Sequence, residues 1–213
     1  IMGKPGYEVL AGSVLLDGVE LLDLPTWQRA AAGLHLIMQY PTEVPGVMLD
    51  DVLAEALVER GRSANGLDNL LRAEAARIGF SPELLHRPLN VDLSGGEKKR
   101  NETLQLAVLE PKFAVLDELD SGLDIDALRD CARRVEAASN AGLGVIAITH
   151  YSRLFEELQP DAVHILVKGR IAESGGHELA EELERGGYAK YAGSEPEPTG
   201  GSGRSSLDDL FAL

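Results

Sequence analysis

The chain has 213 residues, and its 44% hydrophobic content is enough for the core of one domain or of a domain with a subdomain. The formal net charge of −15 at pH 7 argues against a nucleic-acid partner held through its phosphates. Cys131 is the only cysteine, which excludes an internal disulfide and any four-thiolate site. We find no signal peptide and no apolar run close to the roughly 20 residues that cross a bilayer, so we expect a cytoplasmic protein without membrane insertion.

The first forty residues predict a hairpin, a short helix and a buried strand. Residues 9–21 have the pattern of a hairpin turned at Asp17-Gly18. A helix is expected over residues 26–32, and a strand over residues 34–38 that ends at Gln39. A glutamine at a strand end is usually a hydrogen-bonded surface residue, so Gln39 alone indicates no function.

The pattern changes to helices between Tyr40 and Asn90. Apolar residues at helical spacing predict helices over 50–60 and 67–78, and Ser81-Pro82 starts a further short one. The stretch 40–48 contains Pro, Val and Met but few charges, so it is either a contact surface for a partner or a capped, solvent-facing loop.

Residues 94–97, Ser-Gly-Gly-Glu, form a Ser-x-x-Glu capping box in front of a helical run. A cap does not need Gly95 and Gly96, each of which costs roughly 1 kcal/mol of helix propensity relative to alanine. Glycine exposes backbone N–H groups, and a helix N-terminus favours an anion. We therefore interpret this helix start as a phosphate site rather than as a plain cap.

A second phosphate-related pattern follows, the apolar run 113–116 that ends in Asp117 and Glu118. Ligands of parallel sheets bind at the carboxyl ends of the strands, which would place Asp117 to hold Mg²⁺ and Glu118 to polarise a water molecule. The alternative is a buried strand followed by an acidic turn. The two patterns together favour the phosphate interpretation.

The last part of the chain repeats the alternation of helix and strand. An amphipathic helix over 125–139 precedes the strand 144–149, which ends at His150. A final hairpin over 161–173 and a helix over 178–184 follow. From residue 193 the composition is that of a flexible linker, although the last residues could dock on a partner.

The run from Leu93 to Asp126, LSGGEKKRNETLQLAVLEPKFAVLDELDSGLDID, resembles the signature motif, Walker B strand and D-loop of ATP-binding-cassette (ABC) ATPases. The segments GGEKKRNE and LDELDSGLDIDAL are more similar to the SufC branch of that family, which serves the SUF system of iron–sulfur cluster assembly. Transporter cassettes usually have Gln where Glu97 stands. The resemblance covers residues 1 to about 191.

The resemblance implies an α/β fold, an ABC ATPase of the P-loop NTPase type with a mostly parallel sheet, an antiparallel β portion and a helical subdomain. The parts expected are residues 1–39 as the remaining N-terminal part of the core, 40–92 as the helical subdomain, 93–192 as the rest of the core, and 193–213 as a flexible tail. No G-x-x-x-x-G-K-[ST] loop occurs in the 213 residues. The resemblance places that Walker A loop just before Ile1, so we expect the N-terminal P-loop part to be missing.

The family's functional residues map onto this chain residue by residue. Glu118 and His150 would be catalytic, and Asp117 and Gln39 would bind Mg²⁺. Nucleotide contacts are expected from Gln39, Ser94, Gly95, Gly96, Glu97 and Asp124. Apart from the resemblance, the basic run Lys98-Lys99-Arg100 lies near acidic loops, and we expect one of its residues to hold Glu118 unproductively until a dimer forms.

The function implied is that of a SufC-like ATPase using ATP and Mg²⁺. ATP would draw two chains into a transient head-to-tail homodimer, and hydrolysis would drive cluster assembly on SufB- and SufD-type scaffold proteins. Two alternatives stay open at this point: the ATP-binding subunit of an ABC transporter, and a chain that binds partners but cannot hydrolyse ATP because Walker A is absent.

Overall fold

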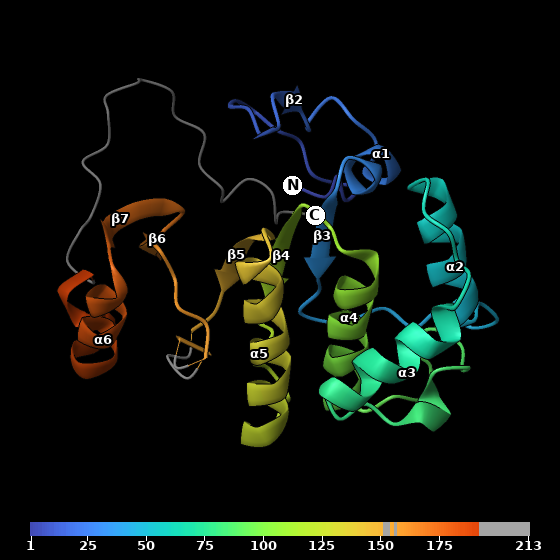
Figure 1. Ribbon diagram of the computed structural model, residues 1–213. Helices are drawn as coiled ribbons and strands as arrows, with labels where there is room; N and C mark the ends of the chain where they lie inside the picture. The colour runs from blue at the N-terminus through green and yellow to red at the C-terminus, as the bar shows by residue number, and fades with distance from the viewer. Residues whose placement is uncertain (151–153, 156, 192–213) are drawn as a thin grey trace, which may run out of the picture. The chain divides into compact units, whose positions relative to one another are not determined.

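The computed structural model describes residues 1–150, 154–155 and 157–191 of the protein (Figure 1). These residues form parts of two compact units, the first ending at Pro160 and the second beginning at Asp161. The expected flexible tail over 193–213 lies outside the described residues. The division of the chain at residues 39, 92 and 192 stays a prediction.

A three-stranded parallel sheet forms the centre of the first unit. Its strands are β3 (Leu34–Ile37), β4 (Phe113–Asp117) and β5 (Gly144–Ile148), in the order β3-β4-β5. Ile37 is paired with Leu116, and Asp117 with Ile148, so the three carboxyl ends lie along one edge. The expected α/β fold with a parallel sheet is confirmed.

The N-terminal hairpin is present but short. Strands β1 (Leu15–Leu16) and β2 (Val19–Glu20) pair antiparallel. Both turn residues have positive φ, 50° at Asp17 and 80° at Gly18, as a tight hairpin turn requires. Helix α1 (Thr26–Ala31) follows, and Gly33, with a φ of 110°, ends the turn before β3.

Helices α2 (Leu49–Glu59) and α3 (Leu67–Arg77), the 3₁₀ turn η1 (Pro82–Leu84) and the long helix α4 (Gly95–Leu109) make up the next part of the chain. Their apolar faces share one core, which reaches α4 through Leu104, Val108 and Leu109. Leu106 of α4 instead packs in the core of the sheet, against residues of β4 and of α5 (Ile125–Asn140). Helix α4 is therefore buried on nearly all sides, whereas α5 has the amphipathic pattern that the sequence predicts.

The second unit is described up to Tyr191. It consists of the antiparallel pair β6 (Val163–Val167) and β7 (Arg170–Gly175), helix α6 (His177–Gly186) and the 3₁₀ turn η3 (Gly187–Tyr191). The turn between the strands has positive φ at Lys168 and Gly169. The predicted final hairpin and the helix after it are confirmed.

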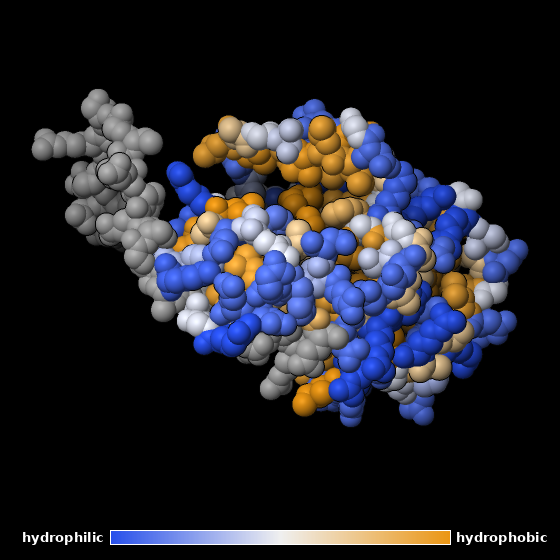
Figure 2. All heavy atoms as spheres, turned by 60° about the vertical axis from the view of Figure 1, so that its left-hand side comes forward, coloured by the Kyte–Doolittle hydropathy of each residue, from blue (hydrophilic) through white to orange (hydrophobic). Residues whose placement is uncertain are grey.

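The N-terminal hairpin and α1 carry an exposed apolar surface. Figure 2 shows hydrophobic residues gathered at the top of the molecule, at the height of β2 and α1 in Figure 1. Tyr7, Leu10 and Trp27 are 78%, 90% and 63% exposed. An apolar surface of this kind is typical of a contact with another polypeptide. Within the described ranges, the helices are all too short or too polar to span a membrane.

Candidate functional site

The carboxyl edge of the sheet brings together three side chains from three different strands. Gln39 follows β3, Glu118 follows β4, and His150 lies two residues beyond β5. The Gln39 amide Nε2 donates to Oε2 of Glu118 at 2.8 Å, and the Nδ1 atom of His150 lies 3.5 Å from Oε1. Glu118 is thus held from both sides, by an amide and by an imidazole.

The backbone at Glu118 has a left-handed conformation, with a φ of 49°. Such a conformation is uncommon for a residue with a Cβ atom, and it is found preferentially at functional sites. The Glu118 amide still donates to the carbonyl of Ile148 at 2.9 Å, so this residue is fixed to β5 while the chain turns away. The carboxylate is about three-quarters buried, with 24% of the side chain exposed.

The basic run beside Glu118 is arranged differently from the prediction. The ammonium of Lys98 donates to Glu43 at 2.7 Å, and that of Lys99 donates to the backbone carbonyls of Met38 and Asp117 at 2.6 and 3.1 Å. In this structure the Glu118 carboxylate is instead held by Gln39 and His150. The predicted contact between the basic run and Glu118 is therefore wrong. Lys99 instead bonds backbone carbonyls at the ends of two strands.

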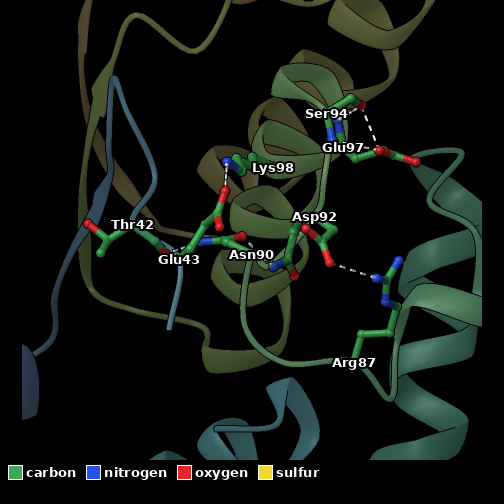
Figure 3. Close-up of polar contacts among 9 residues, drawn as sticks. Thr42, Glu43, Arg87, Asn90, Asp92, Ser94, Glu97 and Lys98 are labelled. Atoms are coloured by element: carbon green, nitrogen blue, oxygen red, sulfur yellow. Dashed lines mark hydrogen bonds and ion pairs between the residues drawn. The ribbon is translucent and has the colours of Figure 1, made fainter. Parts of the chain in front are cut away.

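The start of α4 has the predicted capping box. The Ser94 hydroxyl accepts from the Glu97 amide at 3.3 Å and donates to the Glu97 carboxylate at 2.6 Å, and the same carboxylate accepts from the Ser94 amide at 2.8 Å. Figure 3 shows the two side chains facing each other at the helix end. The hydrogen bonds that the Glu97 carboxylate accepts from Ser94 lower the pKa of Glu97, and the bond from the hydroxyl has a larger effect than the bond from the amide.

The two glycines of this helix turn have different surroundings. A Cβ atom at Gly96 would lie 3.2 Å from the carbonyl oxygen of Gly122, whereas one at Gly95 would meet no atom within 4 Å. The close approach of the loop at Gly122 explains Gly96 by packing. Packing does not explain Gly95, which leaves its bare backbone open to a ligand from outside the chain.

Asp124 lies at the other end of this loop and caps α5. Its Oδ1 atom accepts from the amide of Ala127 at 2.8 Å. Asp124 therefore stabilises the start of α5, and its expected contact with a nucleotide stays a prediction.

Two buried acidic residues near the site were not singled out from the sequence. Asp120 is 8% exposed, and its Oδ2 atom accepts from the hydroxyl of Thr149 at 3.0 Å. Glu102 is 4% exposed and accepts from the amide of Met38 at 2.6 Å. Burial raises the pKa of Glu102 to about 7, against the opposing effects of that amide and of Lys99. No signal in the sequence pointed to Glu102, because its partner Met38 lies 64 positions away along the chain.

The residues present suit a magnesium nucleotide better than a metal ion alone. Among the described residues no cluster of three or more His, Cys, Asp or Glu side chains could hold a metal ion. Magnesium in phosphoryl-transfer sites is typically bound by one or two protein oxygens, by substrate phosphates and by water. Asp117 and the side-chain oxygen of Gln39, both half-buried at the carboxyl edge, could supply those protein oxygens.

Known proteins resemble the chain in sequence and in fold. No family model matches the chain. A probable ABC transporter ATP-binding protein of Streptococcus pyogenes serotype M3 is 47% identical over 197 residues, which cover 90% of this chain and 77% of that protein. The probable ATP-dependent transporter ycf16 of Cyanophora paradoxa is 44% identical over 196 residues, with 88% and 75% covered.

A solved structure shares the fold. The dimeric post-hydrolysis state of the ATP-binding cassette MJ0796, bound to ADP and Pi, has a TM-score of 0.67 and 16% identity, with 79% of this chain and 74% of that chain covered. At this identity the likeness concerns the fold alone. The relatives, however, are similar over most of both sequences. The chain therefore belongs to the family of ABC-type ATP-binding cassette ATPases.

Proposed function

We propose that the protein is an ATPase of the SufC type, in which ATP binding and hydrolysis by a pair of chains drive iron–sulfur cluster assembly on a SufB–SufD-type scaffold. The observation that carries the hydrolysis part is the convergence of Gln39, Glu118 and His150 at one sheet edge. A carboxylate held between an amide and an imidazole is suited to orient and polarise an attacking water molecule.

Each residue of this edge has a distinct task in the proposed reaction. Glu118 would accept hydrogen bonds from the attacking water, and His150 would contact the γ-phosphate. Asp117 and Gln39 would hold Mg²⁺, which when bound neutralises charge on the phosphates. Because Gln39 and His150 already touch Glu118, a shift of either side chain would change the position of the carboxylate.

The signature residues would act on a second chain's nucleotide. Ser94 and the open backbone at Gly95 lie at the free N-terminus of α4, where the helix dipole favours a phosphate. The dimer reported for the related cassette bound to ADP and Pi supports an arrangement of two chains. We infer that Ser94, Gly95 and Gly96 of one chain close over ATP held by the other.

Assignment to the SufC branch rests on the sequence of residues 95–102, GGEKKRNE, and of residues 116–128, LDELDSGLDIDAL. In this structure Lys99, Asn101 and Glu102 are buried and hydrogen-bonded. These three residues of the first run therefore lie in the interior beside the site.

The first experiment measures ATP hydrolysis by the product of the whole coding sequence and by its Glu118→Gln variant. Because the amide cannot act as a base, we expect turnover to fall by about 10²- to 10⁴-fold while ATP binding persists. Equal turnover in the two proteins would contradict the role of Glu118. A coding sequence without any G-x-x-x-x-G-K-[ST] loop would exclude hydrolysis by this chain and leave only the binding of partners.

A second candidate function is favoured by the names of the relatives, several of which are described as transporter subunits. In that case the stretch from Tyr40 to Met48 would contact a membrane protein. Affinity capture of the chain, followed by identification of stoichiometric partners, separates the two. A soluble SufB–SufD pair supports the proposal, and an integral membrane protein overturns it.

A further inference from the structure

We propose that Lys99 and Glu102, two buried charged residues of α4, are positioning residues that hold the peptide groups of Met38 and thereby keep Gln39 against Glu118. This inference rests on the proposed function for its catalytic meaning. Its structural part concerns only the connection between α4 and the end of β3.

Met38 is held from both sides of its backbone. Its amide donates to the Glu102 carboxylate at 2.6 Å, and its carbonyl accepts from the Lys99 ammonium at 2.6 Å. The last residue pair between β3 and β4 is Ile37 with Leu116, so Met38 lies just beyond the ladder. The side chains of α4 therefore bond the peptide groups that the sheet no longer pairs.

Lys99 also joins neighbouring strands. Besides the carbonyl of Met38, its ammonium bonds the carbonyl of Asp117 at 3.1 Å, at the carboxyl end of β4. The residues that follow these two carbonyls are Gln39 and Glu118, whose side chains meet at 2.8 Å. One ammonium thus fixes the backbone next to each member of the pair.

Burial of these two polar residues argues against a purely packing role on energetic grounds. Lys99 is 2% exposed and Glu102 is 4% exposed. Burying a charge is costly, and apolar side chains of similar size often stabilise a protein as well or better. What the polar side chains add is direction, because each hydrogen bond holds one atom of Met38 in place, and the bond from the Lys99 ammonium is charge-assisted and short.

The position of the pair on α4 gives it a further consequence. Ser94 caps the same helix, five residues before Lys99, and this end would face the nucleotide of the second chain. A displacement of α4 on dimerisation would reach Met38 through Lys99 and Glu102, and from there Gln39. The proposed pair is thus a direct physical connection between the signature end of the helix and the catalytic edge of its own chain.

Amide hydrogen exchange tests the structural part without any need for turnover. In Glu102→Ala the Met38 amide loses its acceptor, so we expect its exchange to be faster by about tenfold or more. Glu102→Gln keeps an acceptor oxygen and should restore most of the protection. The matched control is Glu74→Ala, since Glu74 is 3% exposed but bonds Arg77 and Arg134 instead. Unchanged exchange at Met38 in Glu102→Ala, or equal acceleration there in Glu74→Ala, would overturn the proposal.

A double-mutant cycle with Gln39→Ala tests the catalytic part in the product of the whole coding sequence. We expect Glu102→Ala to lower kcat by about tenfold with little change in the KM for ATP, and to have no further effect once Gln39 is absent. A residue that only stabilises the fold would lower activity equally in both backgrounds, and that result would overturn the positioning role. If the unaltered protein does not hydrolyse ATP at all, the proposed function fails, while the exchange result still decides whether the pair holds Met38.

Discussion

Gly95 and Gly96 look alike in the sequence but differ in what surrounds them. Gly96 is packed against the carbonyl of Gly122, 3.2 Å from where a Cβ atom would stand, and Gly95 faces open space. Packing within the chain therefore accounts for the second glycine of the pair but not for the first.

Alanine substitutions separate these two roles. We expect Gly96→Ala to lower the melting temperature, because the backbone of the loop at Gly122 must move to admit the methyl group. Gly95→Ala should leave the melting temperature unchanged or slightly higher, since alanine is the better helix former, but it should weaken ATP-dependent dimerisation. Thermal unfolding and sedimentation with and without ATP check both outcomes. Normal dimerisation of Gly95→Ala would argue against a phosphate contact at this residue.

Sequence reasoning at the scale of residues was successful where a motif fixes local chemistry. The capping box of Ser94 and Glu97 is present with all its bonds because it involves only four consecutive residues. The roles of Gly96 and Glu102 depend on partners 26 and 64 positions away along the chain. A single sequence does not contain that information, so these roles could not be predicted.

At the scale of elements, β3 and α4 contain two titratable groups, the partly buried His35 and the buried Glu102, whose pKa values move in opposite senses. Burial, with a smaller effect of Arg60, lowers the pKa of His35 to about 4. Burial raises the pKa of Glu102 to about 7. His35 therefore stabilises the folded state at pH values above its unfolded pKa, and this contribution is lost as the pH falls. Glu102 has the opposite sign, since ionising it in the folded state becomes a cost as the pH rises.

Unfolding measured between pH 5 and pH 7 should reveal this compensation. A shift of two units or more corresponds to about 3 kcal/mol for each group, so the two slopes should nearly cancel in the unaltered protein. We expect the free energy of unfolding of His35→Leu to fall with rising pH, and that of Glu102→Gln to rise. His86→Gln, at an exposed histidine, serves as the control. Identical pH profiles for all four proteins would contradict the assignment.

The elements themselves were largely predictable. The parallel strands, both hairpin turns and the amphipathic α5 follow from local periodicity and turn chemistry. Apart from the shorter N-terminal hairpin, the structure differs from the expected bounds by one or two residues. Helix α4 is the exception, because it is buried between the helical core and the sheet core and its polar residues mark no solvent face. Amphipathic periodicity is informative only when one side of a helix meets water.

At the scale of the whole molecule, the proposed pair of chains makes each active site composite. One site would take Gln39, Asp117, Glu118 and His150 from one chain and the start of α4 from the other. In a head-to-tail pair the same two surfaces meet twice, so each chain contributes a different half to each of two sites. Defects in different halves should then complement each other.

Mixing two inactive variants tests this arrangement. Ser94→Arg would place a bulky charge at the helix end that faces the other chain, and Glu118→Gln would remove the carboxylate of its own chain. In a mixed pair, one site combines the intact Glu118 of the first variant with the intact Ser94 of the second, while the other site has both defects. We expect an equal mixture to recover about a quarter of the unaltered ATPase rate, since half of the pairs are mixed and half of their sites are intact. The ATPase rate of each variant alone, at the same total concentration, provides the baseline. No recovery above that baseline would mean either that each chain completes its own site or that hydrolysis needs both sites intact. Titrating the unaltered chain with Ser94→Arg separates these two explanations. Only a requirement for two intact sites predicts that activity falls with the square of the fraction of unaltered chains.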